Sequence, residues 1–465
     1  MFSRYWLLLF TVFSFECAFG SMTIQVTGLP QLTPILDTLY LAGTVNNWDE
    51  NSSNHILTNS NGVWSVEIDG TNGSVIEFKI TRGTWARVEG SISGGYIPNR
   101  TVVYQNDQVI QITIAGWEDF GGTTTVTPHV RVLDSNFYMP QLNRARRIWV
   151  VLPTDYYETS ISYPVLYLQD GQNLFNAGTS FSGEWSVDES MINEVASPCA
   201  KMIIIGIDNG GENRLNEYAP WVNNQYNAGG QGDEYAAFIV ETLKPFIDSY
   251  FRTLPDRLNT GIGGSSLGAL ISAYVLFTYP DVFSKAALFS SAYWFNPEIY
   301  NLAENHVVFP DTRIYHVCGT NEGNGSVLED QNDMMNSLIQ VGYDPGQLED
   351  MDWVDGQHSE WFWEREFPAA ADWLFICLSK TGNISHSICR VYPNPAEDFL
   401  VVESQNDIPI DSIQIFNLEG KMVSNQMTNT GRSAQISLHG LLSGTYTIKA
   451  KLRGEFYFES TFLKK

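Results

Sequence analysis

The sequence predicts a central α/β domain with a mostly parallel sheet, flanked by two small all-β sandwich domains. Short segments that alternate polar and apolar residues, with turn signals between them, come first and are typical of a β-sandwich. Continuous apolar segments of strand length, separated by helical stretches, follow and indicate the α/β domain. Hairpin-like alternation returns near the end. At 465 residues the chain is long enough for two or three domains.

The first sandwich is expected over residues 21–120, with strands near residues 39–43, 63–68 and 75–80. A polar segment rich in glycine and threonine follows at 121–128 and is typical of a linker. The two remaining domains are expected on either side of a second linker at 381–390.

The α/β domain is expected over residues 129–380. Its apolar strands include residues 147–152, 165–168 and 202–207, and residues 234–250 are expected to be helical. The last sandwich is expected over residues 391–465, because only hairpin-like alternation remains there.

The first twenty residues predict a signal peptide. Arg4 supplies the positive charge, residues 5–15 form a short apolar core, and residues 18–20 make a small-x-small cleavage site. The apolar core is too short to span a bilayer, and we expect no transmembrane segment later in the chain. The protein is therefore expected to be secreted.

Composition agrees with an extracellular protein. The hydrophobic fraction is 43%, which is enough for packed cores, and 52 acidic against 26 basic residues give a formal charge of -26. Such a surface repels nucleic acid and anionic membranes, so we expect neither as a partner. The four cysteines outside the signal peptide permit one structural disulfide or none, and their spacing predicts no zinc site: Cys199, Cys318, Cys377 and Cys389. We expect no metal and no cofactor.

The strongest chemical signal is the segment GSSLG at residues 264–268. Small and apolar residues precede it and a helix-forming run follows, which is the strand–turn–helix context of a nucleophile elbow. Gly264 and Gly268 relieve crowding around a serine in a strained turn. Ser266 is therefore the expected nucleophile of an α/β-hydrolase. Ser265 is out of register with the two glycines.

A serine hydroxyl needs a base to accept its proton, and in this fold the chain order is serine, acid, histidine. His358, in a loop after a strand-like segment, fits that order. The other six histidines lie before the serine, before any suitable acid, inside a strand, or in the linker and tail: His55, His129, His306, His316, His386 and His439.

The acid is expected at the end of the strand between the serine and the histidine. Glu322 lies there and would stabilise the imidazolium of His358. Asp330 and Asp333 compete for this role, but a solvated helix face explains them better.

The oxyanion of an acyl transfer needs two backbone N–H donors. The residue after the nucleophile, Leu267, should supply one. Gln172, in the glycine-containing loop after the strand at 165–168, should supply the other.

At this point the sequence resembles a known family. The shared motifs are YLQDGQNLF at 167–175, GIDNG at 206–210, NEYAPW at 216–221, IGGSSLG at 262–268 and GTNE at 319–322. Over about residues 140–378 they resemble the putative esterase family, which groups esterase D-like, feruloyl and enterochelin esterases with bacterial mycolyltransferases. The resemblance implies Ser266, Glu322 and His358 as the triad. Many feruloyl members carry Asp where this chain has Glu322.

The first sandwich resembles starch-binding-type carbohydrate-binding modules, through GTVNNW at 43–48, GVW at 62–64 and EFKITRGTW at 77–85. The resemblance places Trp85 at a position that often stacks on sugar. A packing role is the alternative for Trp85, and it is the expected role of Trp48 and Trp64.

The tail resembles the C-terminal sorting domain of the type IX secretion system of Bacteroidetes, through VYPNP at 391–395, LHGLLSGTY at 438–446 and FLKK at 462–465. The resemblance implies passage through the periplasm, the secretion machinery as a partner, and release or attachment at the cell surface.

The leading hypothesis is a secreted serine esterase that hydrolyses carboxylic esters, with acylated polysaccharide or hydroxycinnamoyl esters as substrates. Three alternatives stay open. A siderophore trilactone esterase would share the fold, although outward export argues against it. An acyltransferase would resolve the same acyl-enzyme with a sugar hydroxyl. A surface glycan-binding protein would carry the hydrolase domain without activity.

Overall fold

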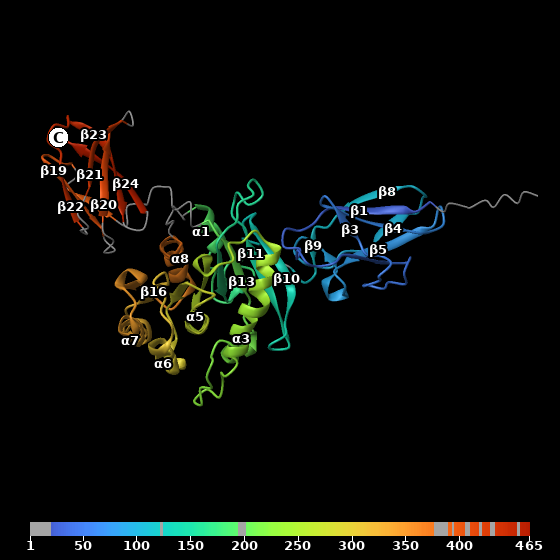
Figure 1. The fold of residues 1–465 in the computed structure, drawn as a ribbon. Coiled ribbons are helices and arrows are strands. Elements are labelled where there is room, and N and C mark those ends of the chain that lie inside the picture. Colours follow the sequence, from blue (N-terminus) through green and yellow to red (C-terminus); the bar gives the residue numbers. More distant parts are fainter. Residues whose placement is uncertain are drawn as a thin grey trace, which may run out of the picture.

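The computed structural model describes residues 20–120, 124–193, 201–375, 389–392, 395–404, 410–417, 421–427, 433–452 and 456–465. The expected signal peptide, up to residue 19, lies outside the described residues. The same is true of residues 121–123 and 381–388 of the two expected linkers. Figure 1 shows a blue β-region, a central region of helices around a sheet, and a red β-region in chain order.

The N-terminal region is built from short strands in three sheets. The four-stranded sheet has the order β3 (Thr58–Ser60), β4 (Val63–Ile68), β1 (Met22–Gly28) and β8 (Val109–Thr113). The others are β2 (Tyr40–Gly43), β5 (Val75–Thr81) and β7 (Arg100–Val103), and the pair β6 (Glu89–Gly90) and β9 (Gly116–Trp117). The alternating apolar residues of β1 and β5 lie in one shared core, and Lys79 and Thr81 on the other face of β5 are buried as well.

The central sheet has eight strands, and only its second strand, β11, runs against the rest. Its order is β10 (Val130–Met139), β11 (Arg144–Val151), β13 (Ile203–Ile207), β12 (Val165–Gln169), β14 (Thr260–Ser265), β15 (Lys285–Phe289), β16 (Arg313–Gly319) and β17 (Leu348–Trp353). From β13 to β17 all neighbouring strands are parallel. The carboxyl ends of these strands therefore meet at one edge of the sheet. The predicted α/β fold with a mostly parallel sheet and two β-regions is confirmed.

Helices cover both faces of this sheet (Figure 1). One core lies under α3 (Gly232–Ala237), α4 (Lys244–Tyr250), α5 (Leu267–Thr278), α6 (Glu298–Asn305) and α7 (Ser326–Val341). The other lies under α1 (Val187–Asn193) and α8 (Glu360–Leu374). The short helix α2 (Arg214–Glu217) precedes α3 in the chain. The helix expected at 234–250 is interrupted by a π-helical segment, Phe238–Leu243.

The N-terminal region contacts β10, the outermost strand of the central sheet. Backbone N–H groups of Ile35 and Leu36 donate to the carbonyls of Val132 and Leu133 in β10, at 2.9 and 3.0 Å. Both side chains pack against the core under α5. The first β-region is thus fixed to the sheet by main-chain pairing as well as by the chain connection.

The C-terminal region consists of two sheets around an apolar core. They contain β18 (Cys389–Tyr392), β19 (Phe399–Ser404) and β22 (Ser433–Ser437), and β21 (Met422–Met427), β20 (Ile410–Phe416), β23 (Gly444–Leu452) and β24 (Phe456–Lys464). Leu400, Ile413 and Ile448 lie in the core between them. In the part of the chain that the structure describes, no helix has the length and apolar character needed to cross a membrane.

Candidate active site

Ser266 occupies a sharp turn between β14 and α5. Its φ of 56° and ψ of -121° lie in a region that costs a non-glycine residue about 1–3 kcal/mol. The turn is held by two main-chain bonds, from Ser266 N to Phe289 O at 2.9 Å and from Ala292 N to Ser266 O at 3.1 Å. Ser265 is buried at the end of the strand, whereas Ser266 is partly exposed.

The flanking glycines are required by close packing. A Cβ on Gly264 would lie 2.9 Å from Gln169 Cβ and 3.0 Å from the carbonyl carbon of Gly268. A Cβ on Gly268 would lie 3.1 Å from Gln169 Cβ. The spacing that singled out Ser266 in the sequence therefore has a steric cause in the fold.

The structure brings Glu322 and His358 together. Glu322 Oε2 lies 2.8 Å from His358 Nδ1, and the carboxylate is buried while the imidazole is 44% exposed. Glu322 Oε1 accepts hydrogen bonds from Gly319 N at 2.7 Å and Ser290 Oγ at 2.9 Å. A carboxylate on Nδ1 fixes the tautomer in which Nε2 can accept a proton.

His358 is also held by packing. Trp363 meets the imidazole edge to face at 5.2 Å between ring centres, and its indole Nε1 donates to Ser290 Oγ at 2.9 Å. Ser290 therefore links the indole of Trp363 to the carboxylate of Glu322, the two groups that hold His358. The sequence analysis did not single out Ser290, whose only signal was its place at the end of an apolar strand.

The two alternative acids, Asp330 and Asp333, and the histidine within a strand, His316, have other surroundings. Asp330 accepts a hydrogen bond from Tyr300 at 3.2 Å, and Asp333 is exposed on α7. His316 Nε2 lies within hydrogen-bond distance of Ser291 and Tyr293. Burial lowers the pKa of His316 to about 3, so its ring stays neutral near neutral pH.

The two expected oxyanion residues lie at the same edge of the sheet. Leu267 opens α5, and the first N–H groups of a helix have no acceptor within it. Gln172 lies in a 3₁₀ turn (Gly171–Asn173) directly after β12, the strand beside β14. Asp170, which precedes that turn, would place Oδ2 only 3.2 Å from a Cβ on Gly268. The two loops therefore pack against each other.

Among the described residues, one group of carboxylates has the mutual spacing of metal ligands. Glu184, Asp188 and Glu189 each place an oxygen within 4.8 Å of the others. Burial, together with the neighbouring charge of Asp188, raises the pKa of Glu189 to about 7.

Trp85 lies far from Ser266 in the sequence, on the N-terminal region. Its side chain is 41% exposed in a 3₁₀ turn (Trp85–Arg87). Trp48 packs against it with 6.2 Å between ring centres and 43° between ring planes. Trp64, by contrast, packs against the core of the region. Trp48 and Trp85 together form an aromatic pair at the surface, which the sequence did not predict.

Sequence comparisons match the two larger parts of the chain to known families. The profile of the family described as "Putative esterase" matches residues 139–374, which is half of the chain. The profile described as "Secretion system C-terminal sorting domain" matches residues 390–462. The sorting domain implies export to the cell surface or the extracellular space.

Individual proteins match parts of the chain. The uncharacterized protein YbbA of Bacillus subtilis (strain 168) is 27% identical over 241 residues, which cover 50% of this chain and 92% of YbbA. The N-terminal region is 36% identical over 101 residues to an alpha-amylase of Niallia circulans, covering 21% of this chain and 8% of the amylase. A solved structure of a ferulic acid esterase aligns with a TM-score of 0.42 and 17% identity, covering 53% of this chain and 98% of that one.

Proposed function

The chain belongs to the putative esterase family, and on that premise we propose that it hydrolyses carboxylic esters through an acyl-enzyme on Ser266. The observation that carries the proposal is the turn at Ser266 together with the Glu322–His358 pair, both at the carboxyl edge of one parallel sheet. A strained serine and an oriented imidazole at the same edge of a sheet are the parts that acyl transfer requires.

In the proposed mechanism, His358 Nε2 accepts the proton of Ser266 Oγ as that oxygen attacks the ester carbonyl carbon. Glu322 stabilises the imidazolium that forms. The backbone N–H groups of Leu267 and Gln172 bind the carbonyl oxygen as it becomes an oxyanion. Collapse of this intermediate expels the alcohol, which takes its proton from His358. Water then attacks the acyl-enzyme by the same steps and releases the acid.

We propose that the substrate is an ester carried by a polysaccharide, with acetyl or hydroxycinnamoyl groups as the acyl part. The sorting domain supports this because it takes the enzyme out of the cell, where polymers are found. The pair of the exposed Trp85 and the half-buried Trp48 also supports it, since flat aromatic faces suit pyranose rings. The N-terminal region would then be a carbohydrate-binding module of residues 21–120.

A panel of p-nitrophenyl esters and methyl hydroxycinnamates tests the proposal, with product analysis in the presence of sugar acceptors. Wild type should release free acid, and a fluorophosphonate probe should label Ser266. Ser266→Ala should lose turnover and labelling, whereas Ser265→Ala should keep labelling if it folds. An active Ser266→Ala variant would falsify the assignment. Acylated sugar as the main product would identify an acyltransferase, and turnover confined to siderophore trilactones would identify a siderophore esterase.

A further inference from the structure

The turn that carries Gln172 begins at a strained residue. Asp170 has φ of 56° and ψ of 46°, the left-handed region that non-glycine residues rarely occupy. Its carbonyl accepts from Asn173 N at 2.9 Å and so closes the turn. The direction of the Gln172 N–H therefore follows from the conformation of Asp170.

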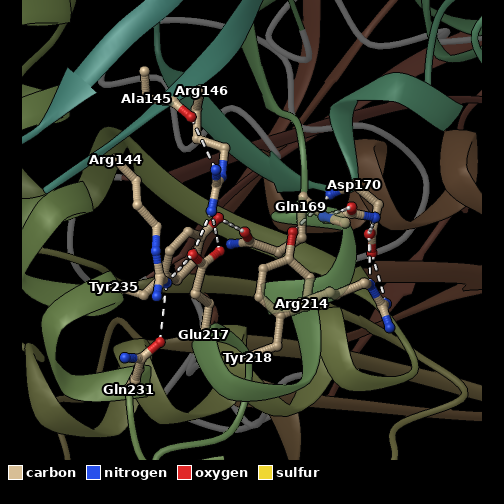
Figure 2. Close-up of polar contacts among 12 residues, drawn as sticks. Arg144, Ala145, Arg146, Gln169, Asp170, Arg214, Glu217, Tyr218, Gln231 and Tyr235 are labelled. Atoms are coloured by element: carbon tan, nitrogen blue, oxygen red, sulfur yellow. Dashed lines mark hydrogen bonds and ion pairs between the residues drawn. The ribbon is translucent and has the colours of Figure 1, made fainter. Parts of the chain in front are cut away.

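Arg214 holds the side chain of Asp170 with two parallel bonds. Arg214 Nε lies 2.8 Å from Asp170 Oδ1, and Nη2 lies 2.8 Å from Oδ2. Asn209 Nδ2 donates to the same carboxylate at 2.7 Å. Tyr218 OH accepts from the main-chain N–H of Asp170 at 3.1 Å. Figure 2 shows Arg214 and Tyr218 reaching Asp170.

The helix that carries Arg214 is itself anchored to the sheet. Glu217 is fully buried and pairs with Arg144, at 2.6 Å, and with Arg146, both on β11 (Figure 2). Breaking such a buried pair from one side is strongly destabilising, because it leaves a buried charge without its partner. Arg214 lies one turn before Glu217, so α2 presents its guanidinium from a fixed position.

The residue before Asp170 is fixed as well. Tyr235 OH donates to Gln169 Oε1 at 2.6 Å, and both side chains are buried. Gln169 Cβ would also lie 2.9 Å from a Cβ at residue 264 and 3.1 Å from one at residue 268. The loop is therefore held at Gln169 against the nucleophile turn and at Asp170 against α2.

The carboxylate of the pair also lies beside the nucleophile turn, since Asp170 Oδ2 would be 3.2 Å from a Cβ on Gly268. Asp170 without its partner would put a negative charge beside the forming oxyanion, which would oppose it.

We propose that Arg214 is a positioning residue, which through Asp170 fixes the Gln172 N–H toward the oxyanion and neutralises the carboxylate beside it. This rests on the proposed function, because it assigns a role within the same acyl transfer. Arg214 itself would not touch the substrate.

The test compares Arg214→Lys and Asp170→Asn with wild type on a p-nitrophenyl ester. Arg214→Lys keeps the positive charge but cannot form the bidentate hydrogen bonds to Asp170. Asp170→Asn removes the negative charge and keeps a side chain of the same size. We expect kcat to fall about 10- to 100-fold, since loss of one oxyanion donor costs about 10²–10³, with KM within about twofold. Arg147→Lys is the matched control, because Arg147 pairs with Asp208 at similar exposure without contacting Asp170.

Inhibition by a trifluoromethyl ketone separates a role in oxyanion binding from a merely structural role. A merely structural role would leave the inhibition constant of the folded enzyme unchanged. The adduct of the ketone with Ser266 carries an oxyanion, so its inhibition constant should weaken by the same factor as kcat/KM. The endpoint of fluorophosphonate labelling gives the fraction of folded active sites and corrects both values.

The proposal is overturned if both variants keep wild-type kcat and inhibition constant, or if kcat falls while the inhibition constant stays unchanged. If Arg214→Lys does not fold, Asp170→Asn decides alone. Failure of the proposed function itself would look different, because wild type would then neither hydrolyse esters nor react with the fluorophosphonate.

Discussion

Glu322 and His358 follow neighbouring parallel strands, and Oε2 of the glutamate lies 2.8 Å from Nδ1 of the histidine. They are 36 residues apart in the chain, yet β16 and β17 end at the same edge of the sheet. The second carboxylate oxygen is occupied by Gly319 N and Ser290 Oγ. Because both carboxylate oxygens have partners, the carboxylate is held in one orientation. It therefore also fixes the orientation of the imidazole through Nδ1.

Replacing Glu322 by Gln should lower kcat by orders of magnitude, about 10⁴-fold where an acid of this kind has been changed to its amide. The amide cannot stabilise an imidazolium and can select the wrong tautomer. Steady-state kinetics on a p-nitrophenyl ester measure the effect. Asp333→Asn is the control, because Asp333 is exposed on α7 and should leave kcat unchanged. A crippled Asp333→Asn beside a normal Glu322→Gln would mean that the acid is misassigned.

Ser290→Ala should lower kcat about 10-fold, because a buried carboxylate loses one donor and Trp363 loses its acceptor, a cost of about 1–3 kcal/mol. Ser291→Ala is a matched control from the next residue. Ser291 is also buried, but it lies against His316, away from Glu322. Equal losses of kcat in the two variants, after correction for labelled sites, would contradict a specific role for Ser290.

The strained turn at Ser266 and the fold around it could be predicted because their cause is local. The glycines around Ser266 reflect crowding within a few residues, and chain order then selected His358. Ser290 and Arg214 could not be predicted, because each acts through a partner brought near by strand order in the sheet. Such contacts depend on the spatial order of strands β12 to β17 in the sheet. That order cannot be read from short local patterns of a single sequence. The π-helical segment at Phe238–Leu243 was missed for a different reason, because the apolar periodicity of a helical stretch does not distinguish it from an α-helix.

Lys285 should make stability depend on pH. It is buried at the start of β15, and burial lowers its pKa to about 8 from an ordinary value of 10.5. The unfolded chain thus binds more protons between these values, and stability rises with pH across that window. The burial penalty is fully present below about pH 8 and lost above about 10.5.

Lys285→Met should therefore raise Tm at pH 7, and the gain should shrink toward pH 10.5. Thermal unfolding of both proteins at several pH values measures it. Lys244→Met is the control, and its Tm should change in the opposite direction. Lys244 is equally buried but bonds to Asp248 at 2.7 Å and to Pro255 O at 2.9 Å, so its loss should destabilise. A gain for Lys285→Met that did not change with pH would show that the charge is not the cause.

Removal of residues 390–465 should leave ester hydrolysis intact but stop export. The sorting profile covers residues 390–462, and the strands of this region form a core of their own. We expect activity to accumulate in the periplasm of a host with the type IX system. Cell fractionation with a p-nitrophenyl ester assay measures this. Extracellular activity at the wild-type level from the shortened chain would rule out the sorting role.

The Trp48–Trp85 pair should bind glycan and so raise activity on polymers. Binding would increase the local concentration of substrate without changing the chemistry at Ser266. Trp85→Ala should therefore leave kcat/KM on small soluble esters unchanged, yet slow release of acid from insoluble acylated polysaccharide. Retention of the full chain on insoluble starch and xylan is the direct measurement, and it should fall in the same variant.

A tryptophan can also be exposed at a surface without binding anything, and Tyr96→Ala separates these cases. Tyr96 is 75% exposed on the same region, and its ring lies 4.9 Å from Lys79 Nζ instead of against another aromatic ring. If glycan binding needs the paired faces, Tyr96→Ala should behave as wild type while Trp48→Ala behaves as Trp85→Ala. Equal polymer activity in all four proteins, with no retention on any glycan, would leave the N-terminal region as a spacer. A loss in Tyr96→Ala as large as in Trp85→Ala would place binding over a wider surface than the tryptophan pair.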